Sequence, residues 1–239
     1  KDLPVRPPVM CSGCPHRGLF HILQKNKVTV CGDIGCYTLG ALAPYNAMDA
    51  VLCMGASVSM NLRMEKAKGI DFVKNTVSLI GDSTFFHSGI TGLVDMIYND
   101  GHGTVIILDN STTGMTGHQP NPSTGKNAKG EVATVVDIEQ VCRGVGVKHV
   151  VTVDPFDLKE MDRVLKEEMA REEVSVIITR RPCALIIKDD PPFYIDQEKC
   201  TKCKACYRLG CPAISIVDEN VVIDRSQCTG CTLCVGTCN

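Results

Sequence analysis

The chain has 239 residues, enough for one large domain and one small one; 44% of them are hydrophobic and 22% are charged. Its formal net charge of −2 provides no basic surface for nucleic acid, and no apolar run approaches the ~18 residues that a membrane span needs. We therefore expect a globular protein with neither a nucleic-acid partner nor a membrane anchor.

Cysteine is the outlier of the composition, with fifteen residues. Thiols grouped as CxxC, with no secretory signal ahead of them, are typical of metal ligands rather than of disulfides. We therefore expect a cytoplasmic location in oxygen-poor surroundings. The sequence begins with Lys1 rather than Met and ends one residue after Cys238, so we also expect a fragment of a longer polypeptide.

Short β-branched runs alternate with amphipathic segments between about residues 28 and 179. Runs with so little polar alternation are typical of parallel strands buried on both faces. Their alternation with helices predicts an α/β domain with a doubly wound parallel sheet, whose ligand binds at the carboxyl ends of the strands. The predicted strands are KVTVCG, AVLCMG, TVSLIGD, GTVIILDN, VKHVVTV and EVSVIITR, and the predicted helices are Ser57–Lys68, Ser88–Asn99, Asp137–Gly144 and Asp157–Arg171, with Asp157 as an N-cap.

Polar residues follow two of these strands directly. Gly81-Asp82-Ser83 ends one strand, and Asp109-Asn110 ends the next. Because both lie at carboxyl ends of parallel strands, we expect them to be neighbours. Asp82 offers a carboxylate and Asn110 an amide oxygen, which suit Mg²⁺ bound to phosphate groups. Gly81 lets the backbone approach those groups, and the following helix N-terminus favours their charge. Ordinary turn chemistry is the alternative interpretation.

Two further segments mark the organisation of the chain. The run from Asn110 to Gly130 is rich in Gly, Thr, Asn and Pro, and a loop of this length in a compact domain is usually functional. Lys188–Pro192, KDDPP, predicts a stiff linker. We therefore expect one domain over residues 1–190 and a second, small α+β domain over 191–239, which is too short to build an adequate apolar core without metal or covalent cross-links.

The tail contains eight cysteines in two CxxCxxC triplets, each followed by one more cysteine. Two residues between thiolates let one loop present three sulfurs to a cubane cluster, whose fourth ligand comes from elsewhere. Zinc more often binds paired CxxC knuckles, so we favour iron–sulfur clusters over two structural zinc sites. The cysteines are Cys200, Cys203, Cys206 and Cys211, then Cys228, Cys231, Cys234 and Cys238.

This tail resembles a bacterial ferredoxin domain with two [4Fe–4S] clusters, including the hairpin AISIVDENVVID between the triplets. The resemblance implies that each cluster takes its fourth ligand from the other motif. One spacing departs from the family pattern, since four residues rather than three separate Cys206 from Cys211. The implied ligand sets are Cys200, Cys203, Cys206 and Cys238 for one cluster, and Cys228, Cys231, Cys234 and Cys211 for the other.

The segment from Gly81 to Asn110 resembles the Gly-Asp…Asn motif of thiamine diphosphate-binding domains. The resemblance implies Mg²⁺ ligands from Asp82, Asn110 and the backbone carbonyl of Thr112. Ser57, after the second strand, could contact the cofactor or simply cap a helix. The candidate cofactor-binding residues are Gly35, Cys36, Gly55, Ser57, Gly81, Asp82, Ser83, Asn110, Thr112, Gly114, Met115 and Thr116.

Motifs along nearly the whole chain carry a wider resemblance. In order, they are CSGCPHR, CGDIGCYTLG, LCMGASVSM, GDSTFFHSGI, LDNSTTGMTGHQ, RRPC and the ferredoxin tail. Together they resemble the carboxyl-terminal half of the large subunit in the indolepyruvate ferredoxin oxidoreductase family, among the 2-oxoacid:ferredoxin oxidoreductases. This implies oxidative decarboxylation of an aryl 2-oxoacid with coenzyme A as co-substrate, and electrons that pass through [4Fe–4S] clusters to ferredoxin.

The resemblance also implies roles for the front cysteines. Members of the wider family hold a third [4Fe–4S] cluster, and the matching residues here are Cys11, Cys14, Cys36 and Cys183. The alternative is that these are buried thiols acting as small apolar groups, the role we expect for Cys31, Cys53 and Cys142. Three histidines are candidates for contact with cofactor or substrate, although a lone histidine is more often structural: His16, His87 and His118.

One part of a thiamine enzyme is missing from the sequence, namely the domain whose glutamate activates the aminopyrimidine. We therefore expect the isolated chain to be inactive. It should need a preceding pyrimidine-binding domain of its own polypeptide, a small subunit and external ferredoxin, in a dimer of heterodimers. The alternatives are an electron-transfer protein with a non-catalytic front domain, a non-oxidative decarboxylase, which the tail cysteines argue against, and an oxidoreductase acting on another 2-oxoacid.

Overall fold

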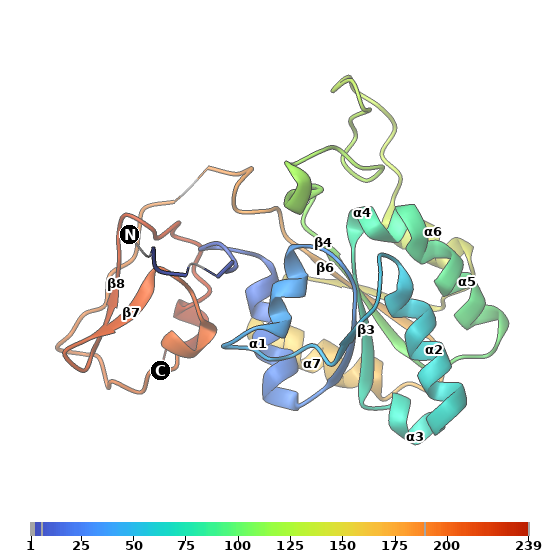
Figure 1. Ribbon diagram of the computed structural model, residues 1–239, viewed down its shortest axis with the longest axis horizontal. Coiled ribbons are helices and arrows are strands. Elements are labelled where there is room, and N and C mark those ends of the chain that lie inside the picture. Colours follow the sequence, from blue (N-terminus) through green and yellow to red (C-terminus); the bar gives the residue numbers. More distant parts are fainter. Residues whose placement is uncertain (1–2, 6, 189, 239) are drawn as a thin grey trace.

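The computed structural model describes residues 3–5, 7–188 and 190–238. Its larger part is a parallel sheet of six strands between two layers of helices, and its tail contains a two-stranded sheet (Figure 1). The predicted α/β class is therefore confirmed. The strands are β1 Thr29–Gly32, β2 Ala50–Val51, β3 Thr76–Gly81, β4 Thr104–Asp109, β5 His149–Val153 and β6 Ser175–Arg180.

The helices divide between the two faces of the sheet, as Figure 1 shows. The apolar side chains of one layer pack with Val77 and Leu79 of β3 in one core. Those of the other layer pack with Ile80 in a second core on the opposite face of the sheet. The first layer is α1 His16–Asn26 and α7 Leu158–Met169; the second is α2 Ala56–Lys68, α5 Ile90–Tyr98 and α6 Ile138–Gly144; the short helices are α3 Ile70–Val73 and α4 Asp82–Thr84.

The strand order is β2-β1-β3-β4-β6-β5. The chain moves from β1 outward to β2 and then returns to place β3 on the other side of β1, so the direction of winding reverses between β1 and β3. Ligands of doubly wound folds bind at such a reversal, in the crevice outside the carboxyl ends of the strands. Gly81 pairs with Leu108 at this edge, directly before Asp82 and Asp109.

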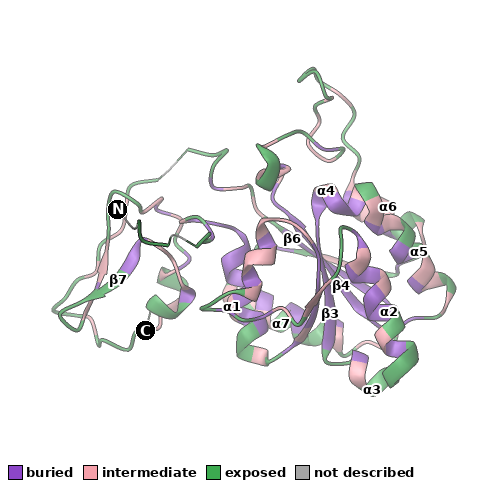
Figure 2. Cartoon of the chain, viewed as in Figure 1, coloured by how far each residue is buried: buried purple, intermediate pink, exposed green. Residues whose placement is uncertain are grey.

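The two central strands explain the uninterrupted apolar runs of the sequence. Every residue of β3 and of β4 is buried, because helices cover both faces of the sheet (Figure 2). The polar exceptions within these strands are Thr76, Ser78, Thr104 and Asp109, and each is at most 6% exposed. The sheet therefore provides a rigid support for the residues that follow its carboxyl ends.

Most predicted elements are present, with three differences. The first is α1, which no prediction covered; its buried His16 and Arg17 break the apolar pattern. The second is β2, which contains only two paired residues of AVLCMG. The third is the helix predicted from Ser88. Helical backbone already begins at Asp82 and passes through a π-helical turn, Phe85–Gly89, before α5. Such turns are frequent beside functional sites.

The tail contains the antiparallel hairpin predicted from AISIVDENVVID, made of β7 Ile214–Val217 and β8 Asn220–Ile223. Asp218 and Glu219 form its two-residue turn with φ of 45° and 65°, as a type I′ turn requires. The tail packs against the front domain through a small apolar cluster of Phe156, Leu209 and Leu233. The predicted boundary after residue 190 stays a prediction.

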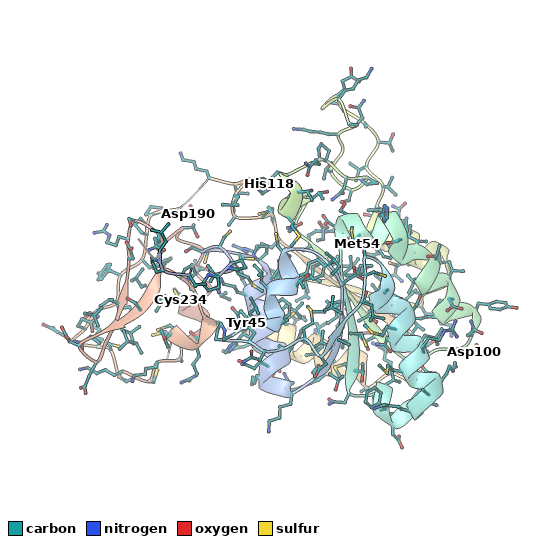
Figure 3. All side chains as sticks on the ribbon, in the orientation of Figure 1. Tyr45, Met54, Asp100, His118, Asp190 and Cys234 are labelled. Atoms are coloured by element: carbon teal, nitrogen blue, oxygen red, sulfur yellow. The ribbon has the colours of Figure 1, made fainter. Side chains whose placement is uncertain are left out.

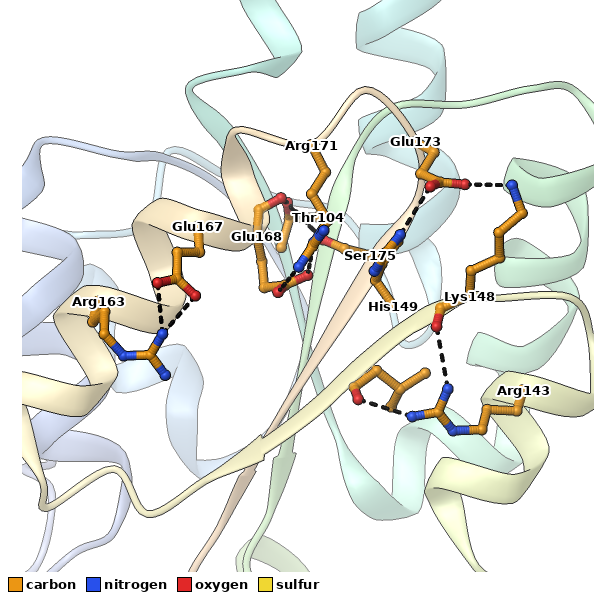
Figure 4. Close-up of polar contacts among 11 residues, drawn as sticks. Thr104, Arg143, Lys148, His149, Arg163, Glu167, Glu168, Arg171, Glu173 and Ser175 are labelled. Carbon is orange, nitrogen blue, oxygen red and sulfur yellow. Dashed lines mark hydrogen bonds and ion pairs between the residues drawn. The ribbon is translucent and has the colours of Figure 1, made fainter.

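Polar contacts fasten the opposite, amino-terminal edge of the sheet (Figure 4). The hydroxyls of Thr104 and Ser175 both donate to the carbonyl oxygen of Glu168, each at 3.2 Å, and the Glu168 carboxylate pairs with Arg171. These bonds tie the end of α7 to the starts of β4 and β6. Within the described residues, we find no helix with the length and apolar character that crossing a bilayer demands.

Candidate functional site

A pocket of about 200 Å³ lies at the carboxyl ends of β1, β3 and β4. Its lining includes all of the predicted cofactor-binding residues except Gly55 and Ser57. The structure therefore brings together predicted residues that are up to 81 positions apart in sequence, from Gly35 to Thr116. The remaining lining residues are His16, Ile34, Tyr37, Met54, Thr84, Leu108 and Thr113.

Asp82 occupies the base of this pocket and is only 3% exposed. One carboxylate oxygen accepts from the backbone N–H of Ser83 at 2.8 Å, and the other from the side-chain amide of Asn121 at 3.0 Å. Burial raises the pKa of Asp82 to about 7 despite these bonds. Because a nearby cation favours the charged form of a carboxyl group, a bound Mg²⁺ would reverse this shift. The donor set is therefore suited to a hard cation.

The other two predicted magnesium ligands lie beside Asp82. Asn110 is 7% exposed and Thr112 is 4% exposed, and both line the pocket. The backbone N–H of Thr112 bonds the Asp82 carboxylate and lowers its pKa, which partly offsets the effect of burial. The structure thus places the three groups at one point, and their role as ligands stays a prediction.

Asp33, which the sequence analysis did not single out, organises the loops around this point. It directly follows β1 and is fully buried. Its carboxylate accepts from the backbone N–H groups of Ile34, Gly55 and Ser57, at 2.8, 2.9 and 3.1 Å. The amides of Gly55 and Ser57 therefore face a carboxylate rather than the pocket. Ser57 is not the helix cap, because Gly55 occupies that position.

Tyr37 forms one wall of the pocket and explains two of its glycines. A Cβ on Gly35 would lie 2.4 Å from the Tyr37 ring, and one on Gly81 would lie 2.8 Å from it. The Tyr37 hydroxyl donates to the carbonyl of Ile34 at 3.1 Å, and its ring meets His16 edge-on at 5.9 Å between centroids. The close approach of the ring thus requires glycine on both loops.

The long loop after β4 projects from the sheet edge and is fastened to the pocket (Figure 1). The Thr113 hydroxyl donates to that of Ser83 at 3.0 Å, and Thr113 and Gln119 form an antiparallel bridge. Together with the bond from Asn121 to Asp82, these contacts hold the loop over the carboxyl edge. The loop is therefore part of the site, as the sequence analysis predicted.

The three candidate histidines differ in position. His16 lines the pocket, is 4% exposed, and has its pKa lowered to about 4 by burial, so its ring is neutral at neutral pH. His87 is exposed on the π-helical turn, and His118, labelled in Figure 3, lies in the long loop; neither lines the pocket. Of the three, only His16 is placed to contact a ligand there.

The four front cysteines lie within electrostatic range of one another. Cys11 and Cys183 each raise the pKa of Cys14 and of Cys36, although burial is the largest cause in both cases. Cys36 also lines the pocket, and the backbone N–H of Cys183 donates to the carbonyl of Asn110 at 2.9 Å. This arrangement fits a cluster beside the pocket, which stays a prediction.

The prediction that the remaining front thiols are buried is correct for two of the three. Cys31 and Cys142 are buried, whereas Cys53 is exposed. Burial of Cys53 was predicted because it lies in the apolar run AVLCMG. That run leaves the sheet after Val51, so Cys53 lies in a loop beside Met54 rather than in a strand.

Two cavities in the tail correspond to the two implied ligand sets. Cys234 borders both of them, so the two sites are adjacent. Four thiols facing one cavity fit a cubane cluster, and the ligand assignment stays a prediction. Among the described residues, no three His, Cys, Asp or Glu side chains are close enough together to hold a single metal ion, either in these cavities or in the front domain. One cavity is lined by Cys200, Cys203, Cys206 and Cys238, and the other by Cys211, Cys228, Cys231 and Cys234.

Both parts of the chain match known protein families. Residues 33–179 match the C-terminal TPP binding domain of thiamine pyrophosphate enzymes, and residues 192–239 match a 4Fe-4S dicluster domain. The chain therefore belongs to the thiamine pyrophosphate enzyme family and has an iron–sulfur domain at its carboxyl end.

Curated relatives narrow the family to which the chain belongs. The chain is 40% identical to indolepyruvate oxidoreductase subunit IorA of Archaeoglobus fulgidus, over 98% of this chain and 39% of that protein. It is 39% identical to the same subunit of Methanothermobacter marburgensis, over 99% of this chain and 40% of that protein. The chain thus spans about 40% of the length of the curated relatives it matches.

A solved structure supports the fold of the larger domain. The 2-oxoglutarate:ferredoxin oxidoreductase from Magnetococcus marinus superposes with a TM-score of 0.63. The match covers 77% of this chain and 67% of that chain at 16% identity. The predicted resemblance to the indolepyruvate ferredoxin oxidoreductases is confirmed by the sequence relatives, and this structural likeness confirms the fold.

Proposed function

We propose that this chain is the diphosphate-binding and electron-transfer part of an enzyme that oxidatively decarboxylates aryl 2-oxoacids such as indolepyruvate and phenylpyruvate. In this reaction the acyl group passes to coenzyme A, CO₂ leaves, and two electrons pass singly to ferredoxin. Residues 1–190 form the thiamine diphosphate-binding domain in this proposal, and residues 191–239 form the two-cluster domain.

One observation carries the proposal. A pocket with the Gly-Asp…Asn residues lies at the carboxyl edge of the sheet, and two adjacent cavities lined by the eight tail thiols lie in a tail packed against the same domain. A decarboxylase that releases an aldehyde needs no route for electrons, and a simple ferredoxin needs no diphosphate pocket. An oxidative thiamine enzyme needs both.

The residues of the pocket divide the work of holding the cofactor. Asp82, Asn110 and the Thr112 carbonyl would bind Mg²⁺ on the diphosphate. Gly81 and the N-terminus of the helix after it favour negative charge at the same point. His16 and Tyr37 would form an uncharged aromatic wall beside the bound cofactor. When bound, thiamine diphosphate supplies the carbon nucleophile and the electron sink for decarboxylation.

The cysteines give the electrons a route out of the pocket. Cys36 lies in the pocket lining, so a cluster held with Cys11, Cys14 and Cys183 would be the first acceptor. The two tail cavities, adjacent at Cys234, would hold the next two clusters. Each cluster takes one electron at a time, which matches transfer to ferredoxin.

Apolar side chains around the mouth of the pocket support a missing partner domain. Two residues that line the pocket, Met54 and Met115, are 50% and 54% exposed. Leu52, two positions before Met54, is 71% exposed. Exposed apolar groups at the rim of a site indicate a surface that another domain covers. We propose that the preceding pyrimidine-binding domain covers it, that a small subunit completes a dimer of heterodimers, and that the assembly is cytoplasmic, where free thiols stay reduced.

Substrate choice rests on the relatives. Their name, indolepyruvate oxidoreductase subunit IorA, supports an aryl 2-oxoacid as substrate. The alternative is another 2-oxoacid, and the 2-oxoglutarate synthase subunit KorB of Archaeoglobus fulgidus, 24% identical to this chain, is a relative of that kind. Steady-state turnover of indolepyruvate, phenylpyruvate and 2-oxoglutarate with coenzyme A and a viologen dye separates these alternatives. A preference for 2-oxoglutarate would contradict the aryl assignment.

The same assay tests the division of labour between chains. The isolated 239 residues should show no turnover, and addition of the pyrimidine-binding domain and the small subunit should restore it. Iron should amount to about eight atoms per chain for two clusters or about twelve for three. If the chain holds iron but never binds thiamine diphosphate with Mg²⁺, and Asp82→Ala changes only stability, the electron-transfer alternative is correct.

A further inference from the structure

A buried arginine joins the front domain to the tail. Arg17, the second residue of α1, is 2% exposed. Its guanidinium donates to the carbonyl of Cys11 at 3.0 Å, to that of Gly210 at 2.6 Å, and to the Tyr45 hydroxyl at 3.3 Å. It also donates to the carbonyls of Met10 and Leu209. One side chain thus binds the loop that holds the first CxxC and the loop that leads to Cys211.

Close packing surrounds this junction. A Cβ on Gly210 would come within 2.3 Å of the Pro44 ring, and one on Gly13 within 2.4 Å of the Thr229 hydroxyl. Tyr45, labelled in Figure 3, donates its hydroxyl to the carbonyl of Leu209 across the junction. Little space is therefore left for water around the guanidinium.

The charge of Arg17 has no carboxylate partner in the described part of the chain. Every ion pair found there involves other arginines, lysines or histidines. Carbonyl dipoles satisfy the N–H groups but leave a net positive charge in a buried place. Burial of an unpaired charge is costly, so a compensating negative group is expected next to it.

The structure locates the place of that group. Arg17 lines the same cavity as Cys211, Cys228, Cys231 and Cys234. In a [4Fe–4S] cluster, four thiolates outweigh the positive charge of the core, and reduction by one electron adds a further negative charge. A fixed buried cation beside such a cluster stabilises the reduced state more than the oxidised state, because net charge and hydrogen bonding set cluster potentials.

We propose that Arg17 is a positioning residue that raises the reduction potential of the cluster at Cys211, Cys228, Cys231 and Cys234. The inference rests on the proposed function, which supplies both the cluster and the electron. In the step concerned, the oxidised cluster gains one electron from the oxidation of the 2-oxoacid, and no bond of Arg17 forms or breaks. Arg17 keeps its proton and balances the added charge.

The test compares Arg17→Gln with Arg17→Lys in anaerobically purified protein. Both variants lose the five-donor fork, but only the glutamine variant loses the charge. A redox titration followed by electron paramagnetic resonance should show that Arg17→Gln shifts one cluster at least tenfold toward its oxidised form, equivalent to 59 mV in the negative direction for one electron. Arg17→Lys should retain most of the wild-type potential, and the second tail cluster should not shift.

A matched control is available in the tail. Arg208 is exposed and donates to the carbonyl of Cys203 at 3.1 Å, beside the other set of cysteines. Because water screens its charge, Arg208→Gln should shift neither cluster by more than about twofold. A shift there as large as that of Arg17→Gln would overturn the role assigned to the buried charge.

The remaining outcomes also decide the inference. Equal shifts in Arg17→Gln and Arg17→Lys, or no shift in either, would overturn it. If Arg17→Gln purifies without that cluster while Arg17→Lys keeps it, the charge serves to hold the cluster rather than to set its potential, and the inference is wrong. If both variants lose the cluster, the hydrogen-bonding geometry of the guanidinium matters rather than its charge, and the inference is wrong. Wild-type protein without iron would instead refute the proposed function itself.

Discussion

The amide of Asn121 donates to the carboxylate of Asp82 at 3.0 Å, across thirty-nine residues of sequence. The two residues belong to different parts of the site. Asp82 directly follows β3, and Asn121 lies in the long loop after β4 and is 6% exposed. This hydrogen bond therefore links the far part of the loop to the group that is proposed to bind Mg²⁺.

Replacement of Asn121 tests this link. Asn121→Ala removes the donor and leaves a buried carboxyl group with one bond fewer, which should cost about 1–3 kcal/mol of unfolding free energy. Binding of thiamine diphosphate with Mg²⁺ should weaken as well, because the loop loses one of its attachments to the pocket. Chemical denaturation and isothermal titration calorimetry measure the two effects. Ser123→Ala, which removes a hydroxyl bonded to Asn121 alone, should have a smaller effect on both.

The raised pKa of Asp82 predicts a pH dependence of stability in metal-free protein. Between about pH 4 and pH 7 the folded protein keeps a proton on Asp82 that the unfolded chain has lost. The free energy of unfolding should therefore fall as pH rises through this window and then level off. Asp82→Asn cannot ionise, so its stability relative to wild type should rise across the window by an amount on the order of 4 kcal/mol. Parallel curves for the two proteins would contradict the prediction.

Asp33 provides a test of how the loops are organised. Asp33→Asn preserves shape but leaves one oxygen to accept bonds from three backbone N–H groups. We expect a loss of about 1–3 kcal/mol and weaker cofactor binding, since Gly55 and Ser57 lose their anchor. Asp49→Asn is the comparison, because Asp49 accepts one backbone N–H, from Val30, on the edge of the sheet. It should destabilise less and leave binding unchanged.

Substitutions at two glycines of the pocket should distinguish an effect on stability from an effect on cofactor binding. Gly35→Ala would place a Cβ 2.4 Å from the Tyr37 ring, so thermal denaturation should show a loss of about 1–3 kcal/mol. Gly114→Ala meets nothing closer than 3.6 Å, from the Asn110 amide and the Cys36 thiol. It should preserve stability within about 0.5 kcal/mol and reduce cofactor affinity, because the methyl group enters the pocket. Equal melting temperatures for the two variants would show that the ring can move.

The crossed ligand sets of the tail predict iron contents. Cys211→Ala should remove the cluster of the second triplet, so iron should fall by about four atoms per chain, although Cys211 follows the first triplet. Cys142→Ala is the control, because Cys142 is a buried thiol far from the tail in the second apolar core. Its iron content should equal that of wild type. Loss of the first-triplet cluster in Cys211→Ala, seen by resonance spectroscopy, would reverse the assignment.

The parts of the site that follow strands could be predicted from sequence. Asp82 and Asn110 directly follow apolar runs, and a parallel sheet brings the carboxyl ends of its strands to one edge. The tail cysteines were predictable for a similar reason, since their spacing is local. In both cases a short stretch of sequence contains the whole signal.

The residues that sequence analysis missed act through distant backbone groups. Arg17 binds carbonyls of Leu209 and Gly210, nearly two hundred residues away, and Asp33 binds amides more than twenty residues away. No periodicity or spacing encodes such partners. The aspartate in CGDIG, directly after a strand, was the available signal for Asp33. Cys53 was predicted wrongly because apolar composition does not reveal where an edge strand such as β2 stops pairing.

The first turn of α1 connects the two halves of the molecule. His16 lines the pocket at the carboxyl edge of the sheet, and the next residue, Arg17, holds the tail. Their Cα atoms are separated by one peptide unit, about 3.8 Å. Any swinging of the tail relative to the pocket would have to break the hydrogen bonds from Arg17 to the carbonyls of Leu209 and Gly210. The span that an electron would cross in the proposed function is thus set by a packed, hydrogen-bonded contact and not by the reach of a tether. Its rate of passage should not depend on diffusion of one module toward the other.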